Sequence, residues 1–159
     1  MSAIQIQKSS LTLRAGKRAM AHIEHNGLQP ADIAILPGAA GGPKGIGLQG
    51  LDLALFGDWL PRTPRVRTLI GASIGSWRFA SACLPDPVAG IKRLGELYTS
   101  QRYAKGVSMQ EVSQSCRKLL HDLLQDQDAE ILANPLYHLN VVVVKSHGLM
   151  VHDRKGALG

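Results

Sequence analysis

Two glycine-rich loops, each between a short apolar segment and an apolar helical pattern, restrict most strongly what this chain can fold into. The first apolar segment is 31–36, and a glycine-rich loop follows it over 37–45. The second segment is 66–70, followed by the sequence GASIGS and a helical pattern over 75–83. Short apolar runs bounded by proline or glycine are typical of buried strands. A strand, a tight loop and a helix, occurring twice in this order, predict an α/β fold with a largely parallel sheet.

Three further segments show apolar residues at helical spacing. They are 13–26, 45–59 and 109–124, and we expect a helix over each of them. The last one begins behind Ser108-x-x-Glu111, which is the pattern of a capping box. Its apolar stripe is expected to form part of the core.

A run of valines near the end of the sequence predicts one more strand. Residues 140–144 hold four consecutive valines, so we expect a strand that is buried on both faces of a parallel sheet. Residues 149–151 are expected to pair with it. No repeat, low-complexity tract or Ser/Gly linker divides the sequence, and we therefore expect residues 1–159 to belong to a single domain.

Composition and charge make several classes of protein poor candidates. The chain has 159 residues, of which 45% are hydrophobic, and a formal net charge of +6 with a pI near 9.6. Its 18 Lys and Arg form no long basic run and only 4% of residues are aromatic, so no nucleic-acid partner is predicted. No apolar run is long enough to cross a bilayer, and the opening MSAIQIQKSS lacks the apolar stretch of a signal peptide. Cys83 and Cys116 show neither zinc-motif spacing nor a disulfide framework, which favours a reducing, cytoplasmic location.

The second loop contains the pattern G-x-S-x-G at residues 71–75. Glycines at the two ends permit a sharp turn between a strand and a helix, and this turn holds the Ser73 hydroxyl at the helix N-terminus. The pattern is short enough to occur by chance, but here an apolar strand precedes it and an apolar helix follows it. This context predicts a nucleophilic serine. The alternative is a glycine-rich turn in which Ser73 is an ordinary helix cap.

The loop over 37–45 also lies between a strand and a helix, so its backbone N–H groups can point at an anion. A Walker A phosphate loop does not fit, because position 43 is proline and Lys44 is followed by glycine instead of a hydroxyl residue. A dinucleotide fingerprint occurs over 45–50, but its first glycine comes nine positions after the expected strand. The third anion is the oxyanion of an acyl-transfer intermediate, bound near a nucleophile on a neighbouring turn. Only this third interpretation explains both loops together.

The order of the two loops resembles the N-terminal half of a patatin-like phospholipase domain. The residues that carry the resemblance are Gly41-Gly42-Pro43-Lys44-Gly45, followed by a helix and then by the G-x-S-x-G pattern. The resemblance covers 31–83 firmly and the later helices and valine-rich strand loosely. It implies a three-layer α/β/α hydrolase fold, incomplete in this chain. It also implies a serine acyl hydrolase that cleaves acyl ester bonds of lipids with a serine–aspartate pair, and we expect neither a cofactor nor a metal.

The resemblance implies a role for each residue of the two motifs. Ser73 is implied as the nucleophile, and the backbone amides of Gly41, Gly42 and Ile74 as the oxyanion hole. The residues implied to support the loops are Lys44, Gly45, Gly71 and Gly75. The family commonly has arginine where this chain has lysine, which keeps the charge but loses the bidentate fork. The expected partners are a lipid or acyl ester substrate and, transiently, a membrane surface.

The catalytic aspartate of the family is not found in this sequence. The family carries it in a later Asp-Gly-Gly/Ala motif, and no aspartate here precedes a glycine. Asp153 follows an expected strand, but its neighbours do not fit the motif, and an exposed turn is the simpler role. A Ser-His-Asp triad would need a histidine after Ser73, and no motif supports any of the four that are present. They are His121, His138, His147 and His152.

We therefore expect residues 1–159 to be the N-terminal part of a domain that continues beyond 159. Taken alone, this chain is expected to be catalytically inactive and marginally stable. Two other functions stay open at this point. One is a catalytically inactive lipid-binding or interaction module of the same fold, and the other is a dinucleotide-binding α/β domain.

Overall fold

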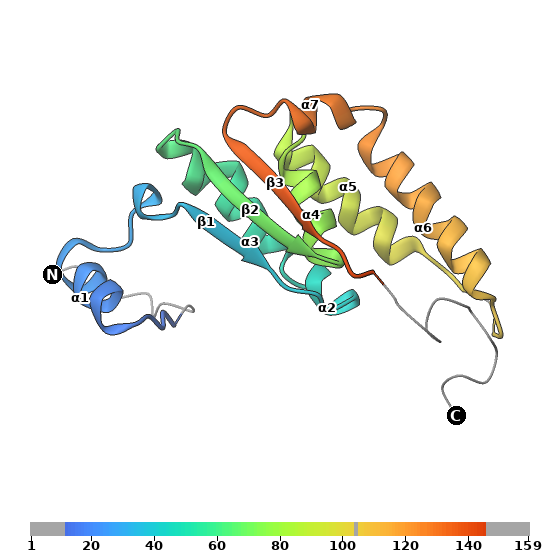
Figure 1. Cartoon of the computed structure of the whole chain (residues 1–159), viewed down its shortest axis with the longest axis horizontal. Helices are drawn as coiled ribbons and strands as arrows, with labels where there is room; N and C mark the ends of the chain where they lie inside the picture. The colour runs from blue at the N-terminus through green and yellow to red at the C-terminus, as the bar shows by residue number, and fades with distance from the viewer. Residues whose placement is uncertain (1–11, 104, 146–159) are drawn as a thin grey trace, which may run out of the picture.

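The computed structural model describes residues 12–103 and 105–145, which form a small sheet and a set of helices (Figure 1). The strands are β1 (Ile35–Gly38), β2 (Arg67–Ala72) and β3 (Tyr137–Val142). The α-helices are α1 (Lys17–Asn26), α2 (Pro43–Ile46), α3 (Gln49–Ala54), α4 (Ile74–Ala82), α5 (Pro87–Ser100), α6 (Met109–Leu124) and α7 (Asp128–Leu132). The other helical turns are η1 (Pro30–Asp32), the π-helical η2 (Leu55–Trp59) and η3 (Leu60–Arg62).

The three strands are parallel and lie in the order β1-β2-β3. Gly38 at the end of β1 is opposite Gly71, and Ala72 at the end of β2 is opposite Val142. The carboxyl ends of the strands therefore meet at one edge of the sheet, which is where ligands bind in open α/β sheets. Figure 1 shows the three arrowheads pointing toward the end of the molecule where α2 begins. The predicted α/β class with a parallel sheet is confirmed.

The core lies between the sheet and the helices that Figure 1 shows behind it. Leu69 of β2 is fully buried there. Phe56 makes edge-to-face contacts with Phe79 of α4 and Tyr137 of β3, with ring centroids 6.1 and 5.5 Å apart. A second cluster joins α5 to α6 and contains Leu94, Leu119 and Leu123. Helix α4 is therefore held from both sides, by the sheet and by the α5–α6 pair.

The opposite face of the sheet is not covered by the helices of 12–103 and 105–145. Successive side chains of a strand point to opposite faces, and on this face Ile35, Ile70 and Val142 are 59%, 37% and 53% exposed. Helix α1 lies apart from the sheet (Figure 1) and buries none of its residues. The described residues thus form two layers, and the third layer of the expected α/β/α arrangement is not seen in them.

Strand β3 starts and ends earlier than the predicted strand over 140–144. The side chain of Asn134 accepts a hydrogen bond from the backbone N–H of Tyr137 at 2.8 Å, and the strand begins at that residue. Val143 and Val144 lie beyond its end and are 82% and 91% exposed. The prediction that the valines are buried on both faces is wrong, because the described helices cover only one face of the sheet.

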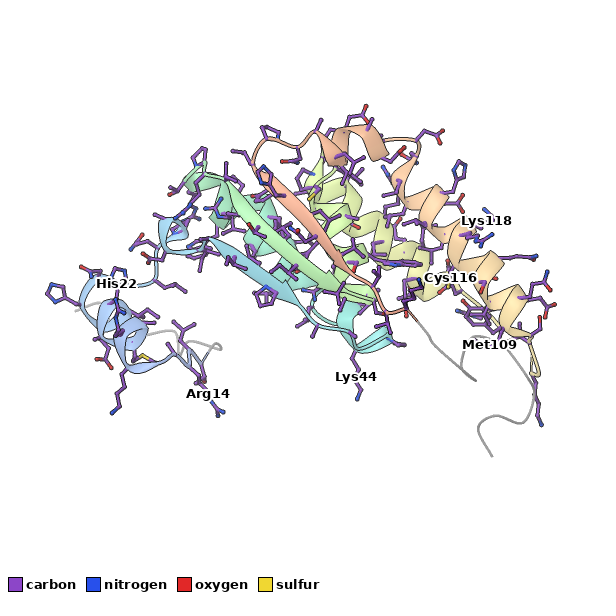
Figure 2. The ribbon with its side chains drawn as sticks, viewed as in Figure 1. Arg14, His22, Lys44, Met109, Cys116 and Lys118 are labelled. Carbon is purple, nitrogen blue, oxygen red and sulfur yellow. The ribbon has the colours of Figure 1, made fainter. Side chains whose placement is uncertain are left out.

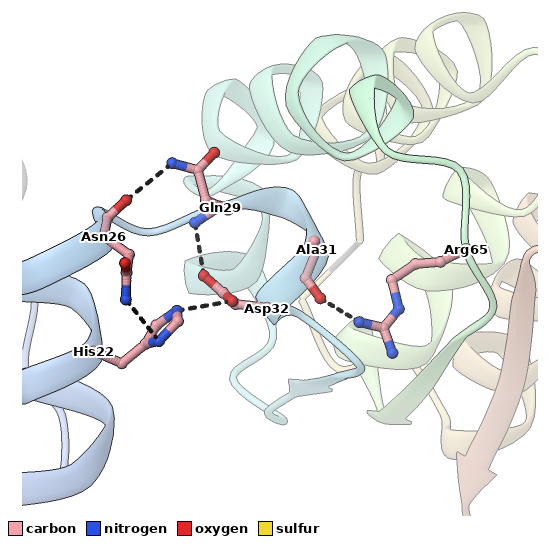
Figure 3. A network of polar contacts seen from close by, with 6 residues as sticks. All are labelled: His22, Asn26, Gln29, Ala31, Asp32 and Arg65. Carbon is pink, nitrogen blue, oxygen red and sulfur yellow. Dashed lines mark hydrogen bonds and ion pairs between the residues drawn. The ribbon is translucent and has the colours of Figure 1, made fainter.

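The first predicted strand, 31–36, is displaced toward the C-terminus, and its beginning forms the turn η1 instead. The Asp32 carboxylate accepts a hydrogen bond from the backbone N–H of Gln29 at 2.8 Å, and this bond lowers the pKa of Asp32. His22 of α1 contacts the same carboxylate at 3.0 Å (Figure 3). The chain therefore turns at Asp32 before β1 begins.

Two helical regions differ from the prediction. The single helix expected over 45–59 is divided near Gly47 into α2 and α3 and ends in η2.

Helix α5 is absent from the sequence-based prediction, although Asp86 caps it by accepting a hydrogen bond from a backbone N–H of its first turn at 2.9 Å. A glycine interrupts its apolar pattern at Gly90, where a Cβ would lie 2.6 Å from the carbonyl oxygen of Ser81 in α4. Gly90 is therefore needed for the close packing of α5 on α4, and the same glycine interrupts the apolar pattern from which a helix would be predicted.

Helix α6 has the predicted bounds and the predicted capping box. Ser108 Oγ accepts from the backbone N–H of Glu111 at 3.2 Å, and Glu111 Oε2 accepts from the backbone N–H of Ser108 at 2.8 Å. The second bond lowers the pKa of Glu111 from its usual 4.5. The stabilisation that this hydrogen bond gives is therefore present at neutral pH and is lost as the pH falls through the lowered pKa of Glu111. Leu119 and Leu123 are buried but Met109 is 64% exposed, so the apolar stripe belongs to the core only in the later turns.

Replacing Ser108 by alanine should lower the free energy of unfolding by about 1 kcal/mol, because the first turn of α6 loses its N-cap acceptor. Urea unfolding followed by circular dichroism measures this change. Ser113→Ala is the matched control, since Ser113 is exposed on the same helix and should stay within about 0.5 kcal/mol of the parent protein. Equal effects of both substitutions would contradict the capping role of Ser108.

Candidate active site

Ser73 occupies the turn between β2 and α4 with a backbone conformation that is rare for a residue with a side chain. Its φ is 52° and its ψ is −124°. Such strained positions cost roughly 1–3 kcal/mol and persist where the surrounding structure imposes them, often at functional sites. The residue is exposed at the N-terminus of α4, and its side chain makes no capping hydrogen bond. The interpretation of Ser73 as an ordinary helix cap is therefore not supported.

The two glycines of the pattern are required by direct contact between backbones. A Cβ at Gly71 would lie 2.5 Å from the Cα of Ser76, so a side chain there would push α4 away from β2. A Cβ at Gly75 would lie 2.5 Å from the carbonyl carbon of Gly38, at the end of β1. The supporting role predicted for Gly71 and Gly75 thus has a geometric reason: they let the turn at Ser73 pack against the end of the neighbouring strand.

The first glycine loop lies against this turn. Gly42, which precedes α2, has φ 52° and ψ −133°, nearly the same backbone conformation as Ser73. Gly45 is buried inside α2, where a Cβ would lie 2.6 Å from Cγ2 of Ile74. The structure therefore brings together the two loops that are far apart in the sequence, as the interpretation based on an acyl-transfer oxyanion requires.

The predicted oxyanion donors are backbone amides at this junction. Among the turn and loop contacts of the described residues, the N–H groups of Gly41, Gly42 and Ile74 donate no backbone hydrogen bond, whereas the carbonyls of Gly41 and Gly42 accept from the N–H groups of Lys44 and Gly45 at 3.3 and 3.0 Å. Ile74 is the first residue of α4, so its N–H belongs to the positive end of the helix dipole. These three amides lie where the two loops meet, and their role as an oxyanion hole stays a prediction.

Lys44 is exposed on α2 and extends away from the sheet into solvent (Figure 2). No ion pair of its ammonium group is found in the part of the chain that the structure describes. Its position at the start of a helix that packs on α4 is compatible with the predicted supporting role. Nothing in this arrangement directs its charge at Ser73.

A buried ion pair that no sequence pattern predicted joins α3 to α4. Arg78 of α4 donates two hydrogen bonds to the carboxylate of Asp52 in α3, both at 2.7 Å. The side chains are 10% and 3% exposed, so the pair is nearly removed from water. The available signal was a charged residue inside each of two apolar helical patterns. This pair fixes α3 to α4, the helix that follows Ser73.

A cavity of about 420 Å³ opens beside Ser73, between α4 and the α5–α6 pair. Its apolar lining comes from Pro43, Ile74, Trp77 and Val112, and its remaining lining from Ser73, Tyr98, Gln101, Tyr103 and Cys116. Figure 2 labels Cys116 on α6. In the sequence, Cys116 lies in an apolar segment, and no pattern there associates it with Ser73. The cavity is the space next to the hydroxyl in which a substrate can lie.

A general base next to Ser73 is not found among residues 12–103 and 105–145. No aspartate, glutamate or histidine lines the cavity. His138 pairs with Thr68, five residues before Ser73, which is roughly 16 Å away along a strand. His121 is exposed on α6 and lies 3.7 Å from Asp126. The other candidates and the second predicted pairing strand lie outside the described residues: His147, His152, Asp153 and 149–151.

The dinucleotide interpretation is disfavoured by where its glycines lie. The fingerprint over 45–50 falls across α2 and α3 instead of forming the turn directly behind β1. Its first glycine packs against Ile74 and is not available to a pyrophosphate. In the described residues, no group of three or more His, Cys, Asp or Glu side chains is placed to hold a metal ion.

None of the described helices is both long and apolar enough to cross a membrane. Comparison of the chain with models of protein families, with curated proteins and with solved structures finds no match.

Proposed function

We propose that this protein is a serine acyl hydrolase of the patatin-like type, with Ser73 as the nucleophile that attacks acyl ester bonds of lipids. The observation that carries the proposal is the strained turn at Ser73, which is packed directly against a glycine-rich loop. A nucleophile and a set of oxyanion donors on neighbouring turns are the two parts that acyl transfer requires.

The reaction would proceed through a covalent acyl-enzyme. Ser73 Oγ attacks the ester carbonyl carbon while a general base accepts its proton, and the amides of Gly41, Gly42 and Ile74 stabilise the negative carbonyl oxygen. The alkoxide leaves as an alcohol after taking up a proton, and water then hydrolyses the acyl-enzyme to a carboxylic acid. By the resemblance, the base is an aspartate. In this proposal the nucleophile and the donors come from the described residues, and no acidic residue or histidine among them lines the cavity beside Ser73.

A fluorophosphonate probe tests this assignment on the full-length protein. The serine oxygen bonds to phosphorus and fluoride leaves, so an activated serine is marked covalently. Peptide mapping should find the label on Ser73 and not on Ser76, which is buried three residues further along α4. A protein that resists the probe, or that carries the label elsewhere, would overturn the proposal.

Replacing Gly42 by valine should lower the rate of ester hydrolysis by about 10²-fold. At φ 52° any side chain is strained, so the loop must shift and the amide donors leave their positions. Gly50→Val is the matched control, because a Cβ at Gly50 meets no atom within 4 Å and its φ is not in the left-handed region. Hydrolysis of a nitrophenyl ester measures both variants, and an unchanged rate in Gly42→Val would exclude the loop from catalysis.

The second candidate function is a lipid-binding module that does not catalyse. It is favoured by one observation, namely that no acidic residue or histidine lines the cavity beside Ser73 within the described residues. Such a module would bind fatty acids or lipid esters without turnover and would not react with the fluorophosphonate probe. Transient contact with a membrane surface fits both functions.

A further inference from the structure

The cavity beside Ser73 lies against two helix surfaces that are not part of either glycine motif. Ile74 and Trp77 are three residues apart and so are neighbours on the surface of α4. Val112 and Cys116 are four residues apart and are neighbours on α6. The cavity therefore extends from Ser73 along the first turn of α4 and is closed on the other side by the first half of α6.

The chemistry of the lining restricts what can occupy this cavity. None of its lining side chains is an acid or a basic residue. A phosphate head group binds where Arg or Lys is available, and none is present among these residues. Gln101 donates a hydrogen bond to the Tyr103 hydroxyl at 2.9 Å, so part of the polar lining is already paired. The lining is suited to an uncharged, largely apolar group.

We propose that this cavity binds the acyl chain of the substrate, and that Val112 and Cys116 determine the accepted chain length; this rests on the hydrolase function proposed above. With the ester carbonyl at Ser73, the acyl chain enters the cavity and the polar head group stays outside. The cavity volume of about 420 Å³ leaves room for several carbons of the chain, at roughly 30 Å³ for each methylene-sized group, about a water's share of liquid volume.

A second, larger cavity of about 590 Å³ is the main competitor. It lies between β1 and α3 and is lined by several leucines, but Ser73 is not among its lining residues. Its lining also includes the charged residues Lys44, Asp52 and Arg78. Gly41, a proposed oxyanion donor, also borders this larger cavity, but of the two cavities only the smaller one is lined by the nucleophile Ser73, which is why we assign the chain to the smaller cavity.

Chain-length profiles of nitrophenyl esters from acetate to dodecanoate, hydrolysed by the full-length protein, test the assignment. Each buried methylene should raise kcat/KM by roughly fourfold until the cavity is full. Val112→Trp should shorten the preferred chain and lower the dodecanoate-to-acetate ratio of kcat/KM at least tenfold. Leu51→Trp makes a comparable enlargement in the competing cavity and should leave that ratio unchanged. A shift caused by Leu51→Trp and not by Val112→Trp would overturn the assignment.

Protection of Cys116 from alkylation gives a readout that does not depend on catalysis. Cys116 is half-buried, whereas Cys83 is buried and its pKa is raised by burial to about 12, so N-ethylmaleimide at neutral pH should react with Cys116 alone. Dodecanoate should slow this reaction at least fivefold, and less in Val112→Trp. Protection without ester hydrolysis would keep the acyl cavity and reject the hydrolase. The absence of both protection and a chain-length shift would overturn the acyl cavity, while fluorophosphonate labelling of Ser73 would show that the hydrolase assignment survives.

Discussion

Replacing Ser73 by alanine is expected to lower ester hydrolysis by at least 10³-fold and to abolish fluorophosphonate labelling. The nucleophile and its base act as one unit, so the loss of either removes most of the rate enhancement. The fold should persist, because alanine at φ 52° carries about the same backbone strain as serine. Steady-state kinetics with a nitrophenyl ester and thermal unfolding of the same samples measure the two quantities.

Ser76→Ala provides the matched control for this substitution. This substitution also removes one serine hydroxyl, three residues further along the chain. The buried Oγ of Ser76 has no hydrogen-bond partner in the described structure, so activity and stability should not fall. Ser73→Gly should be inactive and more stable than the parent, because glycine relieves a strain of roughly 1–3 kcal/mol. Hydrolysis by Ser73→Ala at the parent rate would show that Ser73 is not the nucleophile.

Asp52→Ala is expected to lower the free energy of unfolding by about 3–5 kcal/mol. The substitution leaves the Arg78 guanidinium buried without its carboxylate, and an uncompensated buried charge is among the most destabilising defects. Urea unfolding measures the effect. Asp58→Ala is the matched control, because Asp58 pairs with Arg62 at 2.6 Å on the surface and should change stability by no more than about 1 kcal/mol.

The double variant Asp52→Leu with Arg78→Met separates charge from packing. Apolar residues of similar size at both positions remove the unpaired charge, so much of the lost stability should return. Activity should not return fully if the pair also fixes the glycine loop relative to Ser73. An Asp52→Ala protein with parent-like stability would show that the arginine finds another partner and that the pair does not hold α3 to α4.

Local signals predicted the helices and turns that depend on neighbouring residues. The capping box at Ser108 and Glu111 identified the start of α6, and the glycines around Ser73 identified the turn between β2 and α4. Both depend on contacts within a few residues of the chain, and these are visible in the sequence.

Features that depend on distant contacts were not predictable in the same way. The valines after β3 have high strand propensity, but their burial depends on a layer that the described helices do not form. The Asp52–Arg78 pair joins residues 26 positions apart, and the cavity wall at Cys116 comes from a helix separated from Ser73 by all of α5. Nothing near these residues in the sequence indicates their partners.

The close contact between Gly75 and Gly38 has a consequence for how the proposed site would respond to developing charge. Main chain rests on main chain there, with no side chain in between whose rotamer can relax. Electrostatic stabilisation is most effective when the dipoles do not have to reorient during the reaction, since reorientation costs free energy. If the site acts as proposed, a junction with so few internal degrees of freedom would keep its amides aimed before substrate arrives. The reorganisation energy of the proposed site would then be low, because the conformational cost of aligning the dipoles would be met during folding instead of during each turnover.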